Sequence, residues 1–241
     1  MWRMYLTDLL YQTDSYIKEF TARVVGIDPE QRGVLLDRTA FYPGGGGQPH
    51  DVGTLVAGGK TYIVSKVAKG NLHIVEGDDV PAVGTEVHGI LDWERRYRLM
   101  RTHTAMHILC GVVWRDYGAS VTGGNMEPLS GRMDFEFERL QKELVGEIEA
   151  SINAEVQAAR DVRVAILPRE QAFQIPDLIR TKINLLPEGI PEVRTVEIVG
   201  LDLQADGGTH VANTREVGRI HIADYKSKGG INKRIYVELE E

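Results

Sequence analysis

Two histidines four residues apart, His103 and His107, are the first side chains whose type and spacing suggest chemistry. They stand in Arg101-Thr-His-Thr-Ala-Met-His, a stretch predicted to be helical, and this spacing places both imidazoles on one face, one turn apart. Two neutral imidazoles so placed can bind one zinc ion. The same spacing is also typical of two half-buried helix histidines, so the pair alone leaves both interpretations open.

A third histidine, His210, follows in Asp206-Gly-Gly-Thr-His. The paired glycines permit a close approach of the backbone to a metal or ligand, and Asp206 could supply an oxygen ligand. Three histidines from a helix and a distant loop would leave one zinc position open for water, which is the pattern of a catalytic site. The alternative is a glycine turn that carries a solvent-exposed histidine.

Two other kinds of site are disfavoured by the residues present. Position 104 is Thr, whereas a helical zinc metallopeptidase motif carries Glu directly after its first histidine. The chain has a single cysteine, Cys110, which excludes an intrachain disulfide and a cysteine-type zinc site. We expect Cys110 to be a small buried hydrophobic residue.

Composition limits the class of protein and its partners. The 241 residues are 42% hydrophobic, which suits a soluble globular protein of one large or two small domains. The net charge of -7 means that any nucleic acid would have to bind a local basic patch. We find no apolar run near the roughly 20 residues of a membrane helix and no secretory signal, so the cytoplasm is the expected compartment.

The first part of the chain, residues 1–92, is predicted to be a small β-barrel or sandwich. Short runs rich in β-branched residues, separated by Gly, Asn or Asp, follow one another at regular intervals. The predicted strands are residues 20–26, 33–36, 53–56, 60–67, 72–75 and 86–91.

The second part, residues 93–241, is predicted to be α+β, with helices on a mostly antiparallel sheet. Asp92 can cap the helix that carries His103 and His107, which is expected to run from residue 93 to a C-terminal glycine at Gly118. Apolar residues at a three-to-four-residue period predict a second helix over residues 138–160. The remaining predicted elements are strands at 132–137, 162–167, 193–199, 217–223 and 231–239, and a short helix at 168–173.

Several motifs together resemble the editing domain of alanyl-tRNA synthetases. Arg101-Thr-His-Thr-Ala-Met-His-Ile-Leu is similar to its first zinc motif, and Gly207-Gly-Thr-His-Val-Ala-Asn-Thr-Arg-Glu-Val-Gly to its second. Phe41-Tyr-Pro-Gly-Gly-Gly-Gly-Gln-Pro-His-Asp-Val-Gly resembles the glycine-rich motif of the preceding barrel, and Arg132-Met-Asp-Phe-Glu-Phe and Lys226-Ser-Lys-Gly-Gly-Ile-Asn-Lys-Arg-Ile also resemble this family. The motifs are in family order, and we see no upstream aminoacylation domain. The chain therefore resembles the free-standing alanyl-tRNA editing proteins, AlaX, in their medium-length form.

The resemblance implies a function and a set of site residues. It implies hydrolysis of tRNA(Ala) mischarged with serine first and glycine second, by a site with one zinc ion held by His103, His107 and His210. Thr122 matches a threonine that recognises the serine hydroxyl. Substrate contacts are also implied for the glycine-rich motif, Gly44, Gly45, Gly46, Gly47 and Gln48, and for Thr209. The basic side chains that could meet tRNA phosphates are Arg98, Arg101, Lys226, Lys228 and Lys233.

One residue departs from the family pattern. The second motif often carries Cys four residues before its histidine, and here that position is Asp206. Zinc accepts carboxylate oxygen, so either Asp206 or a water molecule could be the fourth ligand. Two alternative functions stay open, a zinc hydrolase of small esters or amides and a non-catalytic RNA-binding module with a structural zinc. No protein partner is inferred, and the oligomeric state is open.

Overall fold

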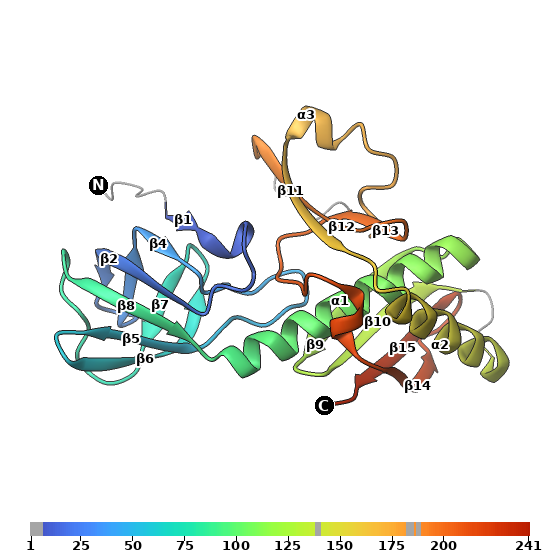
Figure 1. Ribbon diagram of the computed structural model, residues 1–241, viewed down its shortest axis with the longest axis horizontal. Coiled ribbons are helices and arrows are strands. Elements are labelled where there is room, and N and C mark those ends of the chain that lie inside the picture. The colour runs from blue at the N-terminus through green and yellow to red at the C-terminus, as the bar shows by residue number, and fades with distance from the viewer. Residues whose placement is uncertain (1–6, 138–140, 182–185, 187–188) are drawn as a thin grey trace. The chain divides into compact units, whose positions relative to one another are not determined.

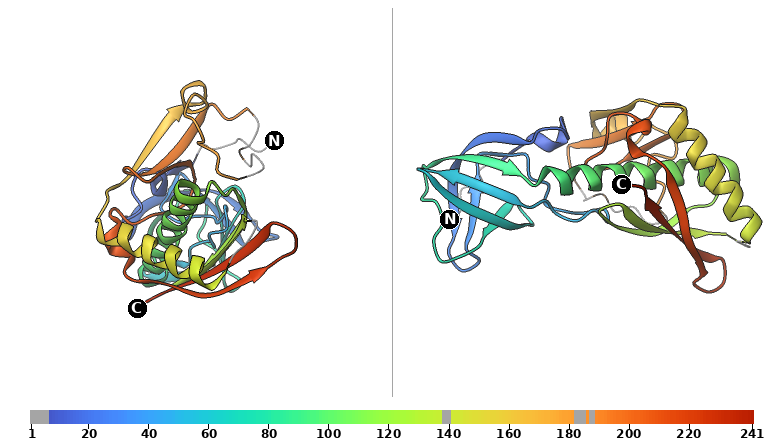
Figure 2. Two further views of the ribbon diagram at one scale, coloured as in Figure 1. Left: turned by 90° about the vertical axis from the view of Figure 1, so that its right-hand side faces the viewer. Right: turned by 60° about the horizontal axis from the view of Figure 1, so that its bottom comes forward.

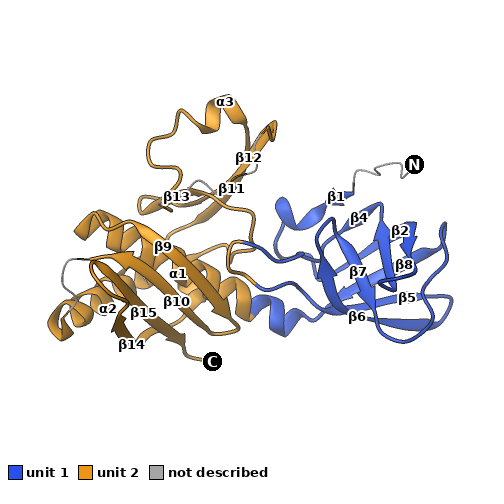
Figure 3. Ribbon diagram, turned by 180° about the vertical axis from the view of Figure 1, so that it is seen from behind, with its two compact units in different colours: residues 1–45, 49–97 blue, residues 46–48, 98–241 orange. Residues whose placement is uncertain are grey.

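The structure is a computed structural model that describes residues 7–137, 141–181, 186 and 189–241. The chain divides into two compact units, coloured separately in Figure 3. The first unit comprises Met1–Gly45 and Pro49–Tyr97, and the second Gly46–Gln48 and Arg98–Glu241. The short segment Gly46–Gln48 thus belongs to the second unit although both its flanks belong to the first. The domain boundary expected near residue 92 stays a prediction.

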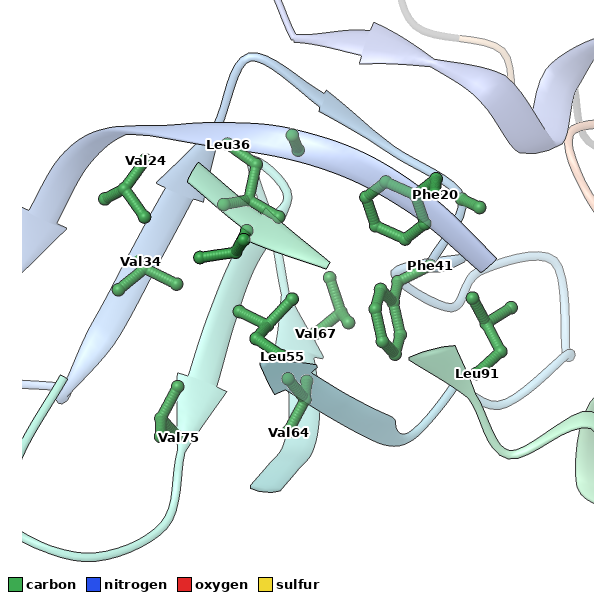
Figure 4. Packing of buried hydrophobic residues seen from close by; sticks show 13 residues of the cluster. Phe20, Val24, Val34, Leu36, Phe41, Leu55, Val64, Val67, Val75 and Leu91 are labelled. Carbon is green, nitrogen blue, oxygen red and sulfur yellow. The ribbon is translucent and has the colours of Figure 1, made fainter. Parts of the chain in front are cut away.

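The first unit is built on a closed six-stranded barrel in which every neighbouring pair is antiparallel. The strand order around it is β2-β3-β7-β6-β5-β8. Closure leaves no strand edge unpaired, and alternate side chains fill the interior. Phe20, Leu36, Phe41 and Leu55 are among the residues that pack together inside (Figure 4). The barrel strands are β2 (Glu19–Asp28), β3 (Gly33–Leu36), β5 (Gly53–Ala57), β6 (Lys60–Ala68), β7 (Leu72–Val75) and β8 (Glu86–Leu91).

Two short strands, β1 (Asp8–Leu9) and β4 (Arg38–Thr39), pair in parallel beside the barrel, with the 3-10 turn η1 (Leu10–Gln12) next to β1. A buried ion pair closes the base of the glycine-rich loop. The Arg96 guanidinium donates to both carboxylate oxygens of Asp51, and Asp51 accepts the backbone N–H of Tyr42. The loop at residues 43–50 therefore leaves and re-enters the first unit at one fixed point.

The second unit is organised around α1 (Trp93–Tyr117), whose first residues belong to the first unit. Asp92 caps this helix as expected, since its side chain accepts the N–H of Arg95, and Gly118 ends it with a φ of +61°. From Thr102 to Val113 every residue is buried. Figures 1 and 2 show the reason, because α1 runs between the two sheets of this unit.

These two sheets are both antiparallel, so the single sheet expected from the sequence is in fact divided. One has the order β14-β15-β10-β9, and the other β11-β12-β13. The strands are β9 (Val121–Glu127), β10 (Ser130–Glu136), β11 (Val162–Pro168), β12 (Glu192–Ile198), β13 (Asp202–Ala205), β14 (Ile220–Ser227) and β15 (Asn232–Leu239). The shorter elements are α3 (Arg169–Ala172) and the 3-10 turn η2 (Thr214–Val217).

The helix predicted over residues 138–160 is α2 (Lys142–Gln157), which packs on β14 and η2. Residues 138–140 of that prediction lie outside the described residues. Four strands were not predicted, the two-residue strands β1 and β4 of the first unit and β9 and β13 of the second. The α+β class with an N-terminal barrel is confirmed. Among the described residues, no helix is both long and apolar enough to cross a membrane.

Candidate metal centre

Four side chains of the second unit converge on one point, His103, His107, Asp206 and His210. Each offers a ligand atom, and these atoms all lie within 4.8 Å of one another. The imidazoles of His103 and His210 stack with ring centroids 4.1 Å apart. All three histidines are buried, and the Asp206 side chain is 13% exposed. The structure thus brings together the residues that the two sequence motifs singled out.

The donor set fits a zinc ion. The Oδ1 atom of Asp206 lies 3.5 Å from Nε2 of His103, and its Oδ2 atom lies 3.0 Å from Nε2 of His210. Ligand bonds of about 2.0–2.1 Å in a tetrahedral site separate neighbouring ligand atoms by about 3.3 Å. Three imidazole nitrogens and one carboxylate oxygen are also ligands that zinc accepts.

Each histidine has a second partner that orients its ring. Nδ1 of His103 lies 2.9 Å from Oε1 of Gln48, Nδ1 of His107 lies 3.2 Å from Oδ2 of Asp202, and Nδ1 of His210 lies 3.2 Å from Oγ1 of Thr104. The amide oxygen and the carboxylate can only accept, so they fix Nδ1 as the protonated nitrogen of His103 and His107. This arrangement leaves Nε2 as the atom that could bind a metal ion, as outer partners do in established metal sites.

The glycine-rich loop reaches the centre through Gln48, which is buried. Its Oε1 accepts the N–H of Thr209 at 3.0 Å, and its Nε2 donates to Oγ1 of Thr209 at 2.8 Å. The same Oε1 faces His103, so Gln48 ties the loop, α1 and the segment around His210 together. A Cβ on Gly46 would lie 3.9 Å from Oδ1 of Asp206, which places this exposed glycine beside the candidate ligand.

Two glycines allow the elements to meet this closely. A Cβ on Gly208 would lie 2.3 Å from Cε1 of His103, closer than any real contact, so only glycine fits there. A Cβ on Gly111, within α1, would lie 2.9 Å from Cγ of Leu201 and 3.0 Å from Cβ of Asp202. This close approach brings Asp202 within reach of His107.

Burial and neighbouring charges set the protonation states. Burial lowers the pKa of His103 well below its usual value and lowers that of His210 to about 4, although the Asp206 charge opposes both shifts. Burial acts in the same direction on His107, but the hydrogen bond to Asp202 and the nearby carboxylates outweigh it and raise the pKa of His107. Burial would raise the pKa of Asp206, yet the surrounding imidazoles hold it well below its usual value. His103, His210 and Asp206 are thus favoured in the states that bind metal, neutral imidazole and ionised carboxylate. The raised pKa of His107 instead favours an imidazolium, which must lose its proton before it can bind a metal.

Sequence reasoning missed the outer partners Asp202 and Thr104. Gln204 donates to Oδ2 of Asp202 at 2.6 Å, and Nε of Arg180 lies 3.5 Å from its Oδ1. A usable signal was present, because polar residues alternate with apolar ones at 202, 204 and 206, the pattern of a half-buried strand. Cys110 is buried as expected, and burial raises the pKa of its thiol.

Thr122 lies on strand β9. It is exposed, and its hydroxyl donates to Oδ1 of Asn232 at 3.1 Å. The register with β10 shifts there, because Asp134 pairs with Gly123 and Phe135 with Val121, so Thr122 is the extra residue of a β-bulge. Two residues further along β9, the carbonyl oxygen of Gly124 lies 3.1 Å from where a Cβ on Gly47 would be. Thr122 is therefore close along the strand to the glycine-rich loop.

The basic side chains named from the sequence differ in their surroundings. Arg101 donates to the carbonyls of Val217 and Glu240, and the buried Lys233 donates to the carbonyl of Gly230, so both hold neighbouring turns and strand ends. Arg98 lies 3.3 Å from Glu241, Lys226 is exposed and pairs with Asp224, and Lys228 is exposed. Lys226 and Lys228 are the more accessible of these side chains.

Comparison with known protein families agrees with the fold and the site. A family model described as the threonyl and alanyl tRNA synthetase second additional domain matches residues 193–236, which include Asp206 and His210. A model of class II (A) tRNA synthetases matches residues 12–95, which include the barrel. The candidate metal centre therefore lies in a protein that resembles the synthetase editing-domain class.

Full-length relatives define the family more narrowly. The chain is 42% identical over 240 residues to the alanyl-tRNA editing protein AlaX-M of Saccharolobus solfataricus, covering 98% of this chain and all of the relative. It is 37% identical to AlaX-M of Methanosarcina barkeri, covering 97% of this chain and 99% of the relative. It also matches 24% of the alanine–tRNA ligase of Pyrococcus furiosus, at 40% identity over 222 residues. The chain belongs to the AlaX-M family of alanyl-tRNA editing proteins, which confirms the resemblance found in the motifs.

Proposed function

We propose that this protein hydrolyses the ester that joins a wrong amino acid to tRNA(Ala), serine first and glycine second. The observation that carries the proposal is the cluster of three histidines and Asp206, joined by Gln48 to the glycine-rich loop, in a chain that aligns along its whole length with editing proteins. The expectation of an aminoacyl-tRNA deacylase is confirmed at the level of the family.

The proposed cofactor is one zinc ion held by His103, His107 and His210, with Asp206 as the fourth ligand. A zinc ion held by these four side chains would have to take a water molecule or the ester carbonyl as a fifth ligand, and it would then lower the pKa of that water to about 7 or polarise the carbonyl. In the net reaction a water oxygen bonds to the carbonyl carbon, the ester C–O bond breaks, and the tRNA 3′ oxygen leaves with a proton.

The chain's own residues contribute position and charge. Gln48, Asp202 and Thr104 hold the three imidazole rings so that each Nε2 atom faces the same point. Gly46 leaves the space beside Asp206 free of a side chain, so an aminoacyl group can approach there. Burial of the imidazoles excludes bulk water, which strengthens the electrostatic interactions within the site.

We assign recognition of serine to the hydroxyl of Thr122. Its proton is donated to Asn232, so its remaining lone pairs can accept a hydrogen bond from the serine hydroxyl. A site that pairs a substrate hydroxyl discriminates against alanine because its own polar group would be left unpaired.

For the tRNA, we propose contact through the β14–β15 hairpin. The exposed Lys226 lies 5.0 Å from the Tyr236 ring and Lys228 is exposed nearby, in a chain whose net charge is -7. Phosphate contacts of this kind carry most of the salt dependence of nucleic-acid binding.

The test compares seryl-, glycyl- and alanyl-tRNA(Ala) as substrates of the full chain. We expect release of serine and glycine and little release of alanine. Thr122→Val should lower kcat/KM for seryl-tRNA(Ala) by about tenfold, the worth of one hydrogen bond, with zinc content unchanged. Thr61→Val, at an exposed strand threonine of the barrel, is the matched control.

Two results would contradict the proposal. Hydrolysis of free serine esters with none of aminoacyl-tRNA would indicate a small-molecule hydrolase, and tight tRNA binding without turnover would indicate a binding module. An unchanged ratio of seryl- to alanyl-tRNA hydrolysis in Thr122→Val would show that Thr122 does not recognise serine. It would leave the proposed deacylase activity itself untouched.

A further inference from the structure

Arg194 is a buried arginine on β12, the central strand of the three-stranded sheet. The β12–β13 ladder ends at the pair Thr195 and Ala205, and Asp206 is the next residue along the chain. A residue just past the end of a ladder has no strand partner of its own in the regular pattern, so something else must fix its position.

Arg194 holds the backbone of Asp206 from both sides. The N–H of Asp206 donates to the carbonyl of Arg194 at 3.1 Å, and Nη1 of Arg194 donates to the carbonyl of Asp206 at 2.9 Å. The first bond extends the ladder by one residue, and the second joins the Arg194 side chain to the carbonyl of the same residue, Asp206. Asp206 therefore cannot shift along the strand without breaking one of these bonds.

The same guanidinium also lies beside the Asp206 carboxylate. Nη1 of Arg194 lies 3.7 Å from Oδ2 of Asp206, and the N–H of Gly208 donates to that oxygen at 2.7 Å. The hydrogen bond from Gly208 and the charge of Arg194 both act on Oδ2, which leaves Oδ1 facing His103. The carboxylate is thus held in one orientation before any ion binds.

We propose that Arg194 is a positioning residue of the metal centre, which acts through Asp206 to hold the fourth ligand in place. The inference rests on the proposed function, because it takes the cluster to bind zinc. Arg194 lies outside both sequence motifs, and it is the side chain that holds the backbone and carboxylate of Asp206.

Electrostatic repulsion by Arg194 would weaken metal binding, whereas its positioning of Asp206 would strengthen it. A guanidinium near a dication repels it, so if charge dominated, removal of Arg194 would tighten metal binding. If positioning dominates, removal loosens it, and outer partners of metal ligands typically contribute 10–100-fold in affinity. The sign of the change therefore separates the two effects.

The experiment measures zinc affinity by competition with a chromophoric chelator for the native chain, Arg194→Met, Arg194→Lys, Asp206→Ala and the double variant Arg194→Met/Asp206→Ala. We expect Arg194→Met to weaken zinc binding 10–100-fold. Arg194→Lys should weaken it in the same direction, because an ammonium keeps the charge but not the planar fork. In the Asp206→Ala background, loss of Arg194 should change affinity less than about threefold, since a residue that acts through Asp206 has nothing left to position.

Arg160→Met is the matched control, because Arg160 is a half-buried arginine of the same unit that donates to Glu155 and to the carbonyl of Val199. We expect it to keep native zinc affinity. If Arg194→Met does not fold, Arg194→Lys and its double variant with Asp206→Ala decide the question in the same way. Cobalt in place of zinc gives a second readout, since its visible spectrum reports coordination geometry, which Arg194→Met should change.

The proposal is overturned if Arg194→Met binds zinc as tightly as the native chain or more tightly. It is also overturned if the loss is as large in the Asp206→Ala background, because Arg194 would then act independently of Asp206. Serine release from seryl-tRNA(Ala) by the native chain tests the proposed function separately.

Discussion

Asp206 differs chemically from the thiolate that often stands at its position in the second zinc motif. A carboxylate is a harder ligand than a thiolate and contributes a weaker bond to zinc, although both carry one negative charge. We propose that the fixed position of Asp206 offsets this difference. Gly208 and Arg194 fix one oxygen of the carboxylate, and the other lies 3.5 Å from Nε2 of His103.

Substitution of Asp206 tests whether it is a ligand. Asp206→Ala should weaken zinc binding at least about tenfold, because one protein ligand is lost from the set. Asp206→Cys should keep or raise the native affinity, because a thiolate replaces the carboxylate. Zinc affinity by chelator competition measures both. Native affinity in Asp206→Ala would show that the fourth position is filled by water.

Much of this centre could be predicted at the residue scale, because metal ligands are few in kind and their spacing is constrained. His103, His107 and His210 were all identified before the structure. The orientation of the rings could not be predicted, since Gln48, Asp202 and Thr104 lie 55, 95 and 106 residues from the histidines they contact. Gln48 was expected to contact substrate, and its described contacts are with His103 and Thr209.

At the scale of elements, the paired glycines before Thr209 have different roles. A Cβ on Gly208 would lie 2.3 Å from His103 and 2.7 Å from Oε1 of Gln48, whereas a Cβ on Gly207 would meet nothing within 4 Å. The loop between β13 and His210 therefore needs glycine at only one of these two positions for close packing.

Gly208→Ala should displace His103 and lower zinc affinity at least about tenfold, and Gly207→Ala should bind zinc as the native chain does. The two variants are matched, since each adds one methyl group to the same loop. Zinc affinity and thermal unfolding of both measure the effect. Equal zinc affinity in the two variants would contradict the packing described for His103.

The barrel contains a buried histidine of its own. His73 on β7 is fully buried, with Nδ1 3.2 Å from the carbonyl of Val34 and Nε2 2.8 Å from Oγ1 of Thr39. Burial lowers the pKa of His73 to about 4. The unfolded chain binds this proton near pH 6.5 and the folded chain does not, so stability falls as pH drops from about 6.5 to 4.

This shift corresponds to about 3 kcal/mol in the free energy of unfolding across that window. His73→Gln can keep both hydrogen bonds and does not titrate, so its stability should fall less steeply than that of the native chain between pH 6.5 and 4. Urea unfolding at several pH values measures the difference. If the free energy of unfolding fell equally steeply with pH in both proteins, the pH dependence would not come from His73.

Most elements were predictable from sequence because their patterns are local. The barrel strands, α1 and α2 follow from β-branched runs, capping residues and apolar periodicity. Strand β9 was missed because Gly123 and Gly124 interrupt its pattern and Thr122 forms a bulge. Strand β13 has only four residues, Asp202–Ala205, and its alternation of polar and apolar side chains, although present, was not used as a strand signal.

At the scale of the whole molecule, the chain forms two compact units. Gly46–Gln48 belongs to the second unit, while the base of its loop is held in the first by Arg96 and Asp51. The assignment of these three residues to the second unit could not be made from sequence, because it depends on contacts with residues 103, 124 and 209.

The central claim is that one metal ion, held by the three histidines and Asp206, is required for hydrolysis of seryl-tRNA(Ala). The most direct measurement is serine release by the full chain before and after chelation, and again after zinc is restored, with His103→Ala in parallel. We predict that chelation lowers the rate at least about 100-fold, that zinc restores it, and that His103→Ala neither binds zinc nor releases serine. Native rates in the chelated chain or in His103→Ala would contradict the account.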